Sequence, residues 1–501
     1  MPIPTSLFDP AQSSIEAVTA AIDGLNIEGR AWIDGAYVAT AQHLPDKTSP
    51  VDGRTLQVSA GDAADIDRAV SAARCSFDAG AWSQRTNTER RATLLRLADA
   101  MELARPELAL LDALETGRAL QNYYHDSIPK AVDALRWFAT NADRCTDTLL
   151  VDDATAHAVS AREPLGVVGL IVPWNDPLVV FMWKLGAALM MGNSVVVKPS
   201  ENASLSILKV AALAQQSGLP DGVLNVVPGQ GSVAGEALAL HRDVDAIGFT
   251  GSSATAKRIQ AYAGQSNMKR VELECGGKSA FVVSRYCTRL REAAACLAQN
   301  MFYNQGQICS APSRLIIERP VRDQFLEYLL AAAPHYCPGH PFDLRSKTGT
   351  VVNAQQKARI DAFIVQAQRD GARLLNTPCQ PAHPLGIAPH IFEVSDPHCA
   401  LAQEEIFGPV LAVFTVDTLD QAIALANDTR YGLASAIWSD DADEAESAPR
   451  RLRAGIVHVN SYGADTMEAP FGGIKESGIG KDKSLLAFDS YSILKTIWRA
   501  R

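Results

Sequence analysis

From about residue 165 the sequence alternates short apolar runs with segments of helical periodicity, and this alternation is the strongest constraint on the fold. The first apolar runs are 167–172, 194–197, 223–227, 246–249 and 279–283. Such runs, separated by helical segments, are typical of the buried strands of a parallel sheet with crossover helices. A second alternating block follows Cys309, with strand candidates at 314–317, 410–414, 435–438 and 456–459. The chain is therefore predicted to be an α/β protein with two parallel-sheet domains.

The bulk properties agree with a large globular protein. A chain of 501 residues, 47% of them hydrophobic, can bury the cores of more than one domain. Residues 89–114 predict a pair of amphipathic helices, because their apolar side chains have helical spacing that is interrupted near Pro106. The net charge of -10 argues against a nucleic-acid partner. The first residues lack a charged stretch followed by an apolar one, so we expect a cytoplasmic protein that does not span a membrane.

The cysteines predict thiols rather than disulfides or metal ligands. Nine is an odd number, and no two of them form a CxxC pair, which favours reduced thiols. His335, Cys337 and His340 could form half of a metal site, but no second ligand pair follows at a known spacing. A loop at Pro338 and Gly339 is the favoured interpretation, and no metal site is expected.

One thiol and one carboxylate together suggest covalent catalysis. Cys309 lies in the segment FYNQGQICS, and Glu274 lies upstream in ELECGGK. A thiol can attack a carbonyl carbon, and a carboxylate can deprotonate the water that later releases the acyl group, if both line one cleft. Each segment alone is weak evidence for catalysis, because a buried cysteine is usually a core residue and a Gly-Gly step is usually a turn.

Further motifs occur in a fixed order around this pair. They are PWN at 173–175, KPSE at 198–201, FTGS at 249–252, EIFGP at 405–409, and PFGG at 470–473 with Ser477 and Gly478. Together with the two segments above, they resemble the aldehyde dehydrogenase superfamily. The resemblance implies a Rossmann-like NAD-binding domain from 1–145 and 165–272, and a catalytic domain from 273–480. It also implies an antiparallel oligomerisation arm from 146–164 and 486–501, and hence a homodimer or homotetramer.

The cofactor prediction begins at Lys198 and Glu201, which follow the strand candidate 194–197. Ligands bind at that end of parallel strands, where this pair can hydrogen-bond ribose hydroxyls while the carboxylate repels a 2′-phosphate. NAD is therefore favoured over NADP, although Ser200 and Glu201 also suit a solvated helix start. Gly251 and Ser252 would open a helix toward the pyrophosphate. With the family's other contacts, the predicted cofactor set is Val172, Trp174, Lys198, Glu201, Gly231, Phe249, Gly251, Ser252, Cys275, Glu405 and Phe407. Gly231 is equally well interpreted as a plain turn glycine.

The resemblance also assigns the chemistry. Cys309 attacks the aldehyde, the oxyanion is held by the side-chain amide of Asn175 and the backbone N–H of Cys309, and hydride passes to the nicotinamide. Glu274 then activates the water that hydrolyses the thioester to an acid. Lys184 matches a lysine often assigned to proton relay, and it could equally be structural. Asn175 has the competing interpretation of a turn residue before Asp176 and Pro177.

The substrate prediction is that of a polar aldehyde or amino-aldehyde. By resemblance the substrate tunnel is lined by Asp176, Val180, Trp183, Tyr303, Ile308, Ser310, Asp465 and Phe471. Asp465 would pair with a cationic group beside the aromatic residues. Asp176 is favoured instead as the N-cap of a helix with Pro177 at its first position.

Three alternatives to this function stay open. A neutral aliphatic or aromatic aldehyde could replace the amino-aldehyde. In a CoA-acylating enzyme coenzyme A would accept the acyl group, but Glu274 disfavours that chemistry, which needs no base for water. A non-catalytic nucleotide-binding relative would need none of Cys309, Glu274 and Asn175, so their joint presence disfavours it.

Overall fold

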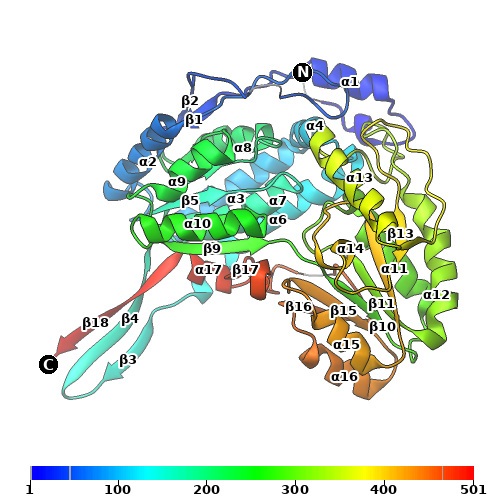
Figure 1. Cartoon of the computed structure of the whole chain (residues 1–501). Coiled ribbons are helices and arrows are strands. Elements are labelled where there is room, and N and C mark those ends of the chain that lie inside the picture. The colour runs from blue at the N-terminus through cyan, green and yellow to red at the C-terminus, as the bar shows by residue number, and fades with distance from the viewer. Residues whose placement is uncertain (1–2, 45–46, 465) are drawn as a thin grey trace.

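Two α/β lobes lie side by side, and a narrow arm projects from the first lobe (Figure 1). The computed structural model describes residues 3–44, 47–464 and 466–501. Each lobe is built on one mixed but mainly parallel sheet, and the arm is a separate antiparallel sheet. The predicted fold class is therefore confirmed.

The first lobe contains an eight-stranded sheet. Its strands, in spatial order, are β17 (Gly478–Ile479), β9 (Arg270–Cys275), β8 (Ala246–Gly251), β5 (Val167–Ile171), β6 (Ser194–Lys198), β7 (Leu224–Val226), β1 (Ala31–Ile33) and β2 (Ala36–Val38). The strands from β9 to β7 are parallel. The chain order reverses at β5, which lies between β6 and β8, and such a reversal opens a crevice at the carboxyl ends of the strands.

The second lobe contains a seven-stranded sheet. Its strands, in spatial order, are β12 (Arg373–Leu374), β13 (His390–Glu393), β14 (Val410–Val416), β11 (Arg314–Glu318), β10 (Ala280–Val283), β15 (Ala434–Trp438) and β16 (Ile456–Val459). All pairs except β12 with β13 are parallel. The four strands predicted after Cys309 are confirmed. β10, however, precedes Cys309 in sequence and still lies inside this sheet, so the second block begins earlier than predicted.

Helices cover both faces of each sheet, because side chains alternate between the faces of a strand. In β5, Val168 and Leu170 pack into one core while Val167 and Ile171 pack into another. The first core is covered by α3 (Asn87–Leu103), α4 (Arg105–Thr116), α6 (Ile128–Asn141), α7 (Pro177–Met190) and α8 (Leu205–Gln216), and the second by α2 (Ala63–Asp78), α9 (Glu236–Leu240) and α10 (Ser253–Gln265). The predicted helix pair at 89–114 is confirmed as α3 and α4.

The second sheet is covered in the same way. One face carries α11 (Leu290–Phe302) and α12 (Arg319–Ala332), and the other carries α13 (Ala354–Arg369), α14 (Ala400–Gln403), α15 (Leu419–Asn427) and α16 (Ala442–Arg451). Three short helices lie outside these layers, namely α1 (Ile15–Asp23), α5 (Leu120–Asn122) and α17 (Leu486–Ser490). In the described part of the chain, no helix combines the length and the apolar character that crossing a membrane requires.

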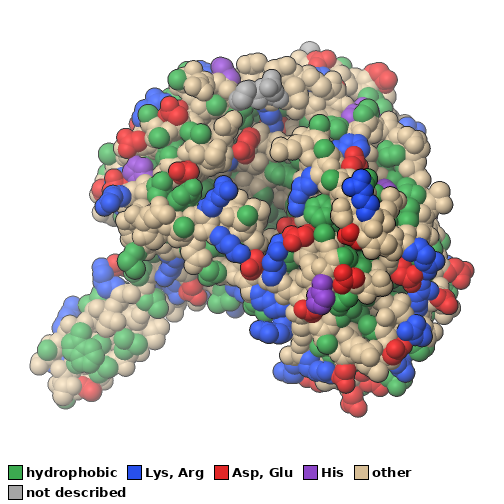
Figure 2. Space-filling view, viewed as in Figure 1, with side chains coloured by type: hydrophobic (Ala, Val, Ile, Leu, Met, Phe, Trp, Pro, Cys, Tyr) green, Lys and Arg blue, Asp and Glu red, His purple; other side chains and the backbone are tan. Residues whose placement is uncertain are grey.

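The arm is a three-stranded antiparallel sheet with the order β18 (Ser492–Ala500), β4 (Ala156–Pro164) and β3 (Thr148–Asp152). Residues 486–490, predicted as part of the arm, form α17 instead. Figure 2 shows hydrophobic side chains gathered on the arm at lower left. The large exposed apolar residues of the arm are Leu149, Leu150, Ile493, Leu494, Ile497 and Trp498.

The cysteines differ from the prediction at one place. Cys337 and Cys379 form a disulfide between two loops that are 42 residues apart in sequence. The prediction of reduced thiols is therefore wrong for this pair, and the proposed half-site around Cys337 is excluded by the same bond. The other seven cysteines, all in the described part of the chain, are free.

Candidate active site

A cavity of about 190 Å³ lies where β5, β8 and β9 end and the second lobe begins. It is lined by Pro173, Trp174, Asn175, Thr250, Gly251, Ser252, Cys275, Gly276, Cys309, Gln356, Arg359, Glu405 and Phe407. The structure therefore brings two of the predicted catalytic residues, Cys309 and Asn175, together with six of the predicted cofactor contacts.

The loop that carries Cys309 has an unusual and tightly held backbone. Asn304 and Gln305 adopt left-handed conformations with φ of 46° and 52°, which side chains other than glycine rarely adopt. The Gln305 side chain donates to the Gly349 carbonyl at 2.7 Å and accepts from the Ile387 amide at 2.7 Å. Such strain persists only where the surroundings fix the backbone, so this loop is a rigid platform for the thiol.

The Cys309 thiol lies in a surrounding that disfavours its charged form. Burial raises its pKa to about 12, and the negative charges of Glu405 and Glu274 add to the increase. The thiol is therefore protonated at neutral pH in this state. Nucleophilic attack by Cys309 requires loss of that proton.

Asn175 places its side-chain amide toward the cysteine loop. It lies between β5 and α7, and its Nδ2 donates to the Gln307 carbonyl at 3.2 Å. An amide nitrogen carries two hydrogens, so one N–H remains for a second acceptor. This arrangement suits an oxyanion-binding role better than that of a solvent-exposed turn residue, because Asn175 is 8% exposed.

Glu274 lies on β9 and is 4% exposed, with both carboxylate oxygens lacking a hydrogen-bond partner among the described residues. A Cβ at Gly472 would collide with this carboxylate, so glycine is needed there. Burial raises the pKa of Glu274 well above its usual range, and the nearby charge of Asp482 adds to the increase, while Lys184 opposes it. A buried carboxylate with free lone pairs and a raised pKa is suited to general-base chemistry.

Lys184 is fully buried on α7 and forms an ion pair with Asp482, with Nζ and Oδ2 2.7 Å apart. Asp482 comes from the segment that follows β17, almost 300 residues away in sequence. Nothing in the local sequence pattern around Asp482 indicated this pairing, and it was not predicted. Lys184 and Glu274 are thus part of one buried charged cluster, and neither lines the cavity that holds Cys309.

Two side chains of the cavity wall offer unused hydrogen-bonding atoms. Glu405 Oε1 and Thr250 Oγ1 are buried with no partner in the described part of the chain, and Thr250 was not among the predicted contacts. Burial raises the pKa of Glu405 to about 7. A Cβ at Gly276 would collide with the Glu405 carboxylate, so that glycine makes room for it. These orphan acceptors fit the hydroxyl groups of a ribose.

Two residues of α13 support this wall and were missed by sequence reasoning. Gln356 donates to the Phe407 carbonyl at 2.9 Å, and Arg359 donates to the Glu405 carbonyl at 2.6 Å. Phe407 adopts a left-handed backbone with φ of 58°, and its ring contacts Trp174 edge-on with ring centres 5.4 Å apart. Only their position on a helix distant in sequence makes these residues part of the site.

A second cavity, of about 340 Å³, lies beside β5, α9 and α10. Glu201 and Gly231 are in its wall, and Glu201 accepts from the Gly231 amide at 3.0 Å and from Lys198 at 3.3 Å. Burial works against ionisation of Glu201, but Lys198 and the Gly231 amide hold its pKa below the usual value. The alternative of a helix start is excluded, because α8 begins at Leu205.

Three of the predicted cofactor residues, Val172, Lys198 and Phe249, line neither cavity. Ser252 caps α10 by accepting from the Thr255 amide at 3.2 Å, which leaves the helix N-terminus at the mouth of the crevice. Phe249 packs against Gly251, and Val172 is buried at the end of β5. The two cavities together fit the two halves of a dinucleotide.

Of the predicted substrate residues that the structure describes, none lines the cavity that holds Cys309. Trp183 and Phe471 contact each other with ring centres 5.2 Å apart. Val180 is buried, Ile308 packs against the second-lobe core, and the Ser310 carbonyl accepts a hydrogen bond from Tyr462. Asp465 lies outside the described residues, so its predicted contact with a cationic group stays a prediction.

Asp176 and Tyr303 have partners that the sequence did not indicate. Asp176 stands at the N-cap position of α7 with Pro177 first in the helix, as predicted, but its side chain makes no capping hydrogen bond. Instead Asp176 Oδ2 lies 3.1 Å from Arg118, and Arg118 also donates to the Tyr303 hydroxyl. Arg118 was missed because no motif marks it.

Comparisons with known proteins agree with this geometry. The model of the aldehyde dehydrogenase family matches residues 37–497. The NADP/NAD-dependent aldehyde dehydrogenase PuuC of Escherichia coli (strain K12) is 46% identical over 476 residues, covering 95% of this chain and 96% of that protein. Aminoacetaldehyde dehydrogenase of Pseudomonas aeruginosa is 42% identical over 488 residues, covering 97% and 98%.

A solved structure gives the same result. The P. syringae indole-3-acetaldehyde dehydrogenase AldA, in a complex with NAD+ and IAA, matches with a TM-score of 0.95 and 44% identity over 97% of this chain and 99% of that one. The resemblance inferred from the ordered motifs is thereby confirmed, and with it the prediction of an enzyme. The chain belongs to the aldehyde dehydrogenase family.

Proposed function

We propose that the protein oxidises a polar aldehyde, of the amino-aldehyde class, to its carboxylic acid with NAD as the cofactor and Cys309 as the nucleophile. The observation that carries this proposal is one cavity holding the Cys309 thiol, the Asn175 amide and the orphan acceptor of Glu405. The first two suit attack on a carbonyl, and the third suits a bound ribose. NAD is supported further by the NAD+ complex of the P. syringae relative.

The residues divide the reaction into two halves. The Cys309 thiol gives up its proton to solvent water, its sulfur bonds to the aldehyde carbon as a thiohemiacetal, and the N–H of Asn175 that Gln307 leaves free stabilises the oxyanion. Bound NAD, held by Glu201, Lys198 and Glu405, supplies the hydride acceptor. The thioester that remains on Cys309 is hydrolysed by a water from which Glu274 removes a proton.

The substrate class is supported by one relative and by the polar groups near the site. The Pseudomonas aeruginosa relative is named for aminoacetaldehyde, whereas the P. syringae relative is named for an aromatic aldehyde. The acidic Asp176 next to Asn175 favours a polar substrate, even though its carboxylate is already paired with Arg118. The test is the rate of NAD reduction with amino-, aliphatic and aromatic aldehydes of matched length. Higher kcat/KM for neutral aldehydes would overturn the substrate class and leave the reaction intact.

Asn175→Ala is expected to slow hydride formation itself. Loss of one oxyanion donor costs about 10²-fold or more in the chemical step. The measurement is the rate constant of the first turnover of NADH in a stopped-flow experiment. Asn141→Ala on α6, which removes hydrogen bonds to the Trp137 carbonyl, Thr140 and Arg144 away from the site, serves as the control. A first turnover at the normal rate in Asn175→Ala would remove this amide from the mechanism.

Glu201→Ser is expected to raise the use of NADP relative to NAD. The variant loses the carboxylate that repels a 2′-phosphate, and it also weakens NAD through lost ribose hydrogen bonds. The measurement is the ratio of kcat/KM for the two cofactors. Glu236→Ser, which removes the other carboxylate of the same cavity, should shift the ratio less. An unchanged ratio in Glu201→Ser would mean that Glu201 does not face the ribose.

The arm supports assembly with further copies of the chain. Its exposed Ile493, Leu494, Ile497 and Trp498 lie on an edge strand, and exposed apolar edges of this kind need a partner. A homodimer or homotetramer is the proposed assembly, with the cofactor and catalytic domains divided as the sequence suggests. A cytoplasmic location is proposed with it, since seven of the nine cysteines are free, and the Cys337–Cys379 disulfide is the observation that argues against it.

A further inference from the structure

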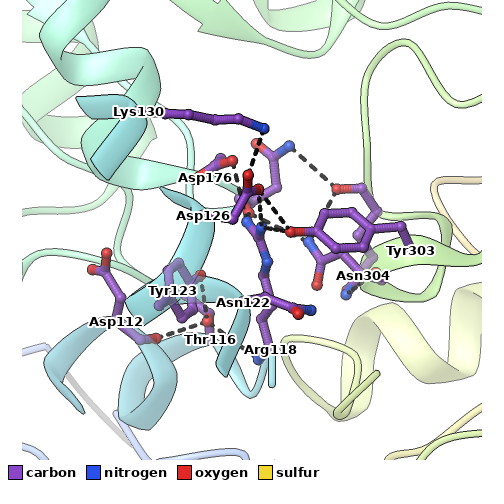
Figure 3. A network of polar contacts seen from close by, with 12 residues as sticks. Asp112, Thr116, Arg118, Asn122, Tyr123, Asp126, Lys130, Asp176, Tyr303 and Asn304 are labelled. Atoms are coloured by element: carbon purple, nitrogen blue, oxygen red, sulfur yellow. Dashed lines mark hydrogen bonds and ion pairs between the residues drawn. The ribbon is translucent and has the colours of Figure 1, made fainter. Parts of the chain in front are cut away.

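Arg118 is a buried arginine that contacts both the segment of Asn175 and the loop that carries Cys309. It follows the end of α4, is 1% exposed, and lies between the rings of Tyr123 and Tyr303, 4.9 Å and 4.8 Å from their centres. Figure 3 shows its guanidinium pointing to a centre where Asp126, Asp176 and Tyr303 converge. The guanidinium forms an ion pair with Asp176 at 3.1 Å, a longer one with Asp126 at 3.9 Å, and a hydrogen bond to the Tyr303 hydroxyl.

The same guanidinium also reaches the backbone of the oxyanion residue. Arg118 Nη1 lies 3.5 Å from the Asn175 carbonyl, which also accepts from Asn304 Nδ2 at 3.3 Å. The peptide of Asn175 is therefore held from two sides, while its side chain donates to Gln307. Freeing the carbonyl would let this peptide rotate and carry the side-chain amide with it.

Arg118 also holds the loop that carries Cys309, through its hydrogen bond to Tyr303. The Tyr303 hydroxyl, which accepts from Arg118, donates to Asp126 at 3.1 Å, and Asp126 in turn pairs with Lys130 at 2.7 Å. Tyr303 directly precedes Asn304 and Gln305, the left-handed residues of the loop that carries Cys309. One side chain thus fixes both segments between which the oxyanion is bound.

Stability alone is a poor reason for this arrangement. A buried ion pair contributes little net stability, because the cost of removing the charges from water offsets their attraction. Oxyanion donors, by contrast, need fixed positions, since displacement by about 1 Å can cost about 10²-fold in rate. A planar guanidinium that is packed between two aromatic rings and donates several N–H groups is suited to holding backbone segments in fixed positions.

We propose that Arg118 is a positioning residue that holds the Asn175 amide in register with Cys309, by binding the Asn175 carbonyl, Asp176 and Tyr303 at once. The inference rests on the proposed function, because it assumes that Asn175 stabilises the oxyanion. The proposal assigns a role in the reaction to Arg118, which belongs to none of the sequence motifs.

The test is the rate constant of the first round of NADH formation in Arg118→Lys. This variant keeps the positive charge but loses the planar set of N–H donors of the guanidinium. We expect its rate constant to fall by about 10- to 100-fold, with NAD affinity unchanged within about twofold, because only the transition state loses stabilisation. A deuterated aldehyde should show an isotope effect at least as large as in the unaltered enzyme, since the chemical step is slowed. Tyr123→Phe, which loses the hydroxyl near Thr116 and keeps the ring against Arg118, should react normally.

A double variant separates positioning from a general loss of structure. If Arg118 acts through Asn175, Arg118→Lys combined with Asn175→Ala should be no slower than Asn175→Ala alone. The inference would be overturned if the rate losses of the two single variants multiplied in the double variant. A normal first turnover in Arg118→Lys would overturn it as well. A normal first turnover in Asn175→Ala would instead show that the proposed oxyanion role is at fault.

Tyr303→Phe covers the case in which the Arg118 variants do not fold. It removes only the hydroxyl that links Arg118 and Asp126, and we expect a first turnover about tenfold slower than that of Tyr123→Phe. Equal rates in these two variants would overturn the proposal.

Discussion

Cys309→Ala is expected to abolish aldehyde oxidation while NAD still binds. The covalent intermediate needs a sulfur at this position, and alanine offers no nucleophile. The fold should survive, because the loop is held by Gln305 and Gln307 rather than by the thiol. The measurements are NADH formation, which should be undetectable, and NAD affinity by fluorescence titration, which should stay near that of the unaltered protein.

Cys296→Ala is the matched control for this variant. Cys296 lies on α11 outside the site, and its thiol accepts a hydrogen bond from Asn300 at 3.6 Å. Its loss should cost about 1 kcal/mol of stability and little activity. Full turnover by Cys309→Ala would remove Cys309 from the mechanism, whatever the control shows.

The sheets could be predicted because most of their strands are buried on both faces and therefore appear as continuous apolar runs. β9 escaped prediction because its sequence RVELEC carries charged side chains at every second position. Two of those charges serve the site or its surroundings, since Glu274 and Glu272 both lie in the buried cluster with Asp482. A strand that supplies catalytic groups loses the apolar pattern by which strands are recognised.

The candidate site could be predicted only as far as its motifs extend. Cys309, Asn175 and Glu405 belong to short recognisable segments, and the structure brings them to one cavity. Pairings across the chain carry no local signal. Arg118 meets Tyr303 across 185 residues, and Lys184 meets Asp482 across 298 residues.

The same reason explains the error at the cysteines. The number of cysteines and the spacing between them describe only the sequence. Cys337 and Cys379 lie on two loops that the fold brings together. These loops pair through the Pro338 carbonyl and the Ala382 amide at 3.0 Å. Spacing rules such as CxxC cannot detect a contact that depends on how two loops pack.

Glu274→Gln is expected to separate acylation from deacylation. The variant keeps the size and the buried position of the side chain but cannot accept a proton from water. We expect a first burst of about one equivalent of NADH per site, followed by turnover reduced by about 10²- to 10⁴-fold, because the acyl-enzyme accumulates. The measurement is the burst amplitude and the steady rate in one stopped-flow trace.

The pH dependence tests the same role independently. Burial and Asp482 raise the pKa of Glu274, so at low pH the carboxyl is protonated and cannot act as a base. The steady rate should therefore rise with pH through this raised pKa, while the burst amplitude persists on the acid side. In Glu274→Gln this rise of the steady rate should disappear.

Glu272→Gln supplies the matched control, since Glu272 lies two residues earlier on the same strand and has a pKa that burial also raises. It should keep the burst and the steady rate on the alkaline side, and because the charge of Glu272 adds to the raised pKa of Glu274, it should move the rise of the steady rate to lower pH. If Glu274→Gln loses the burst together with the steady rate, Glu274 acts before hydride transfer, as the base that activates Cys309. The burst amplitude therefore distinguishes two roles of Glu274, deprotonation of water and deprotonation of Cys309. A steady-state assay cannot distinguish them, because loss of either role would slow turnover.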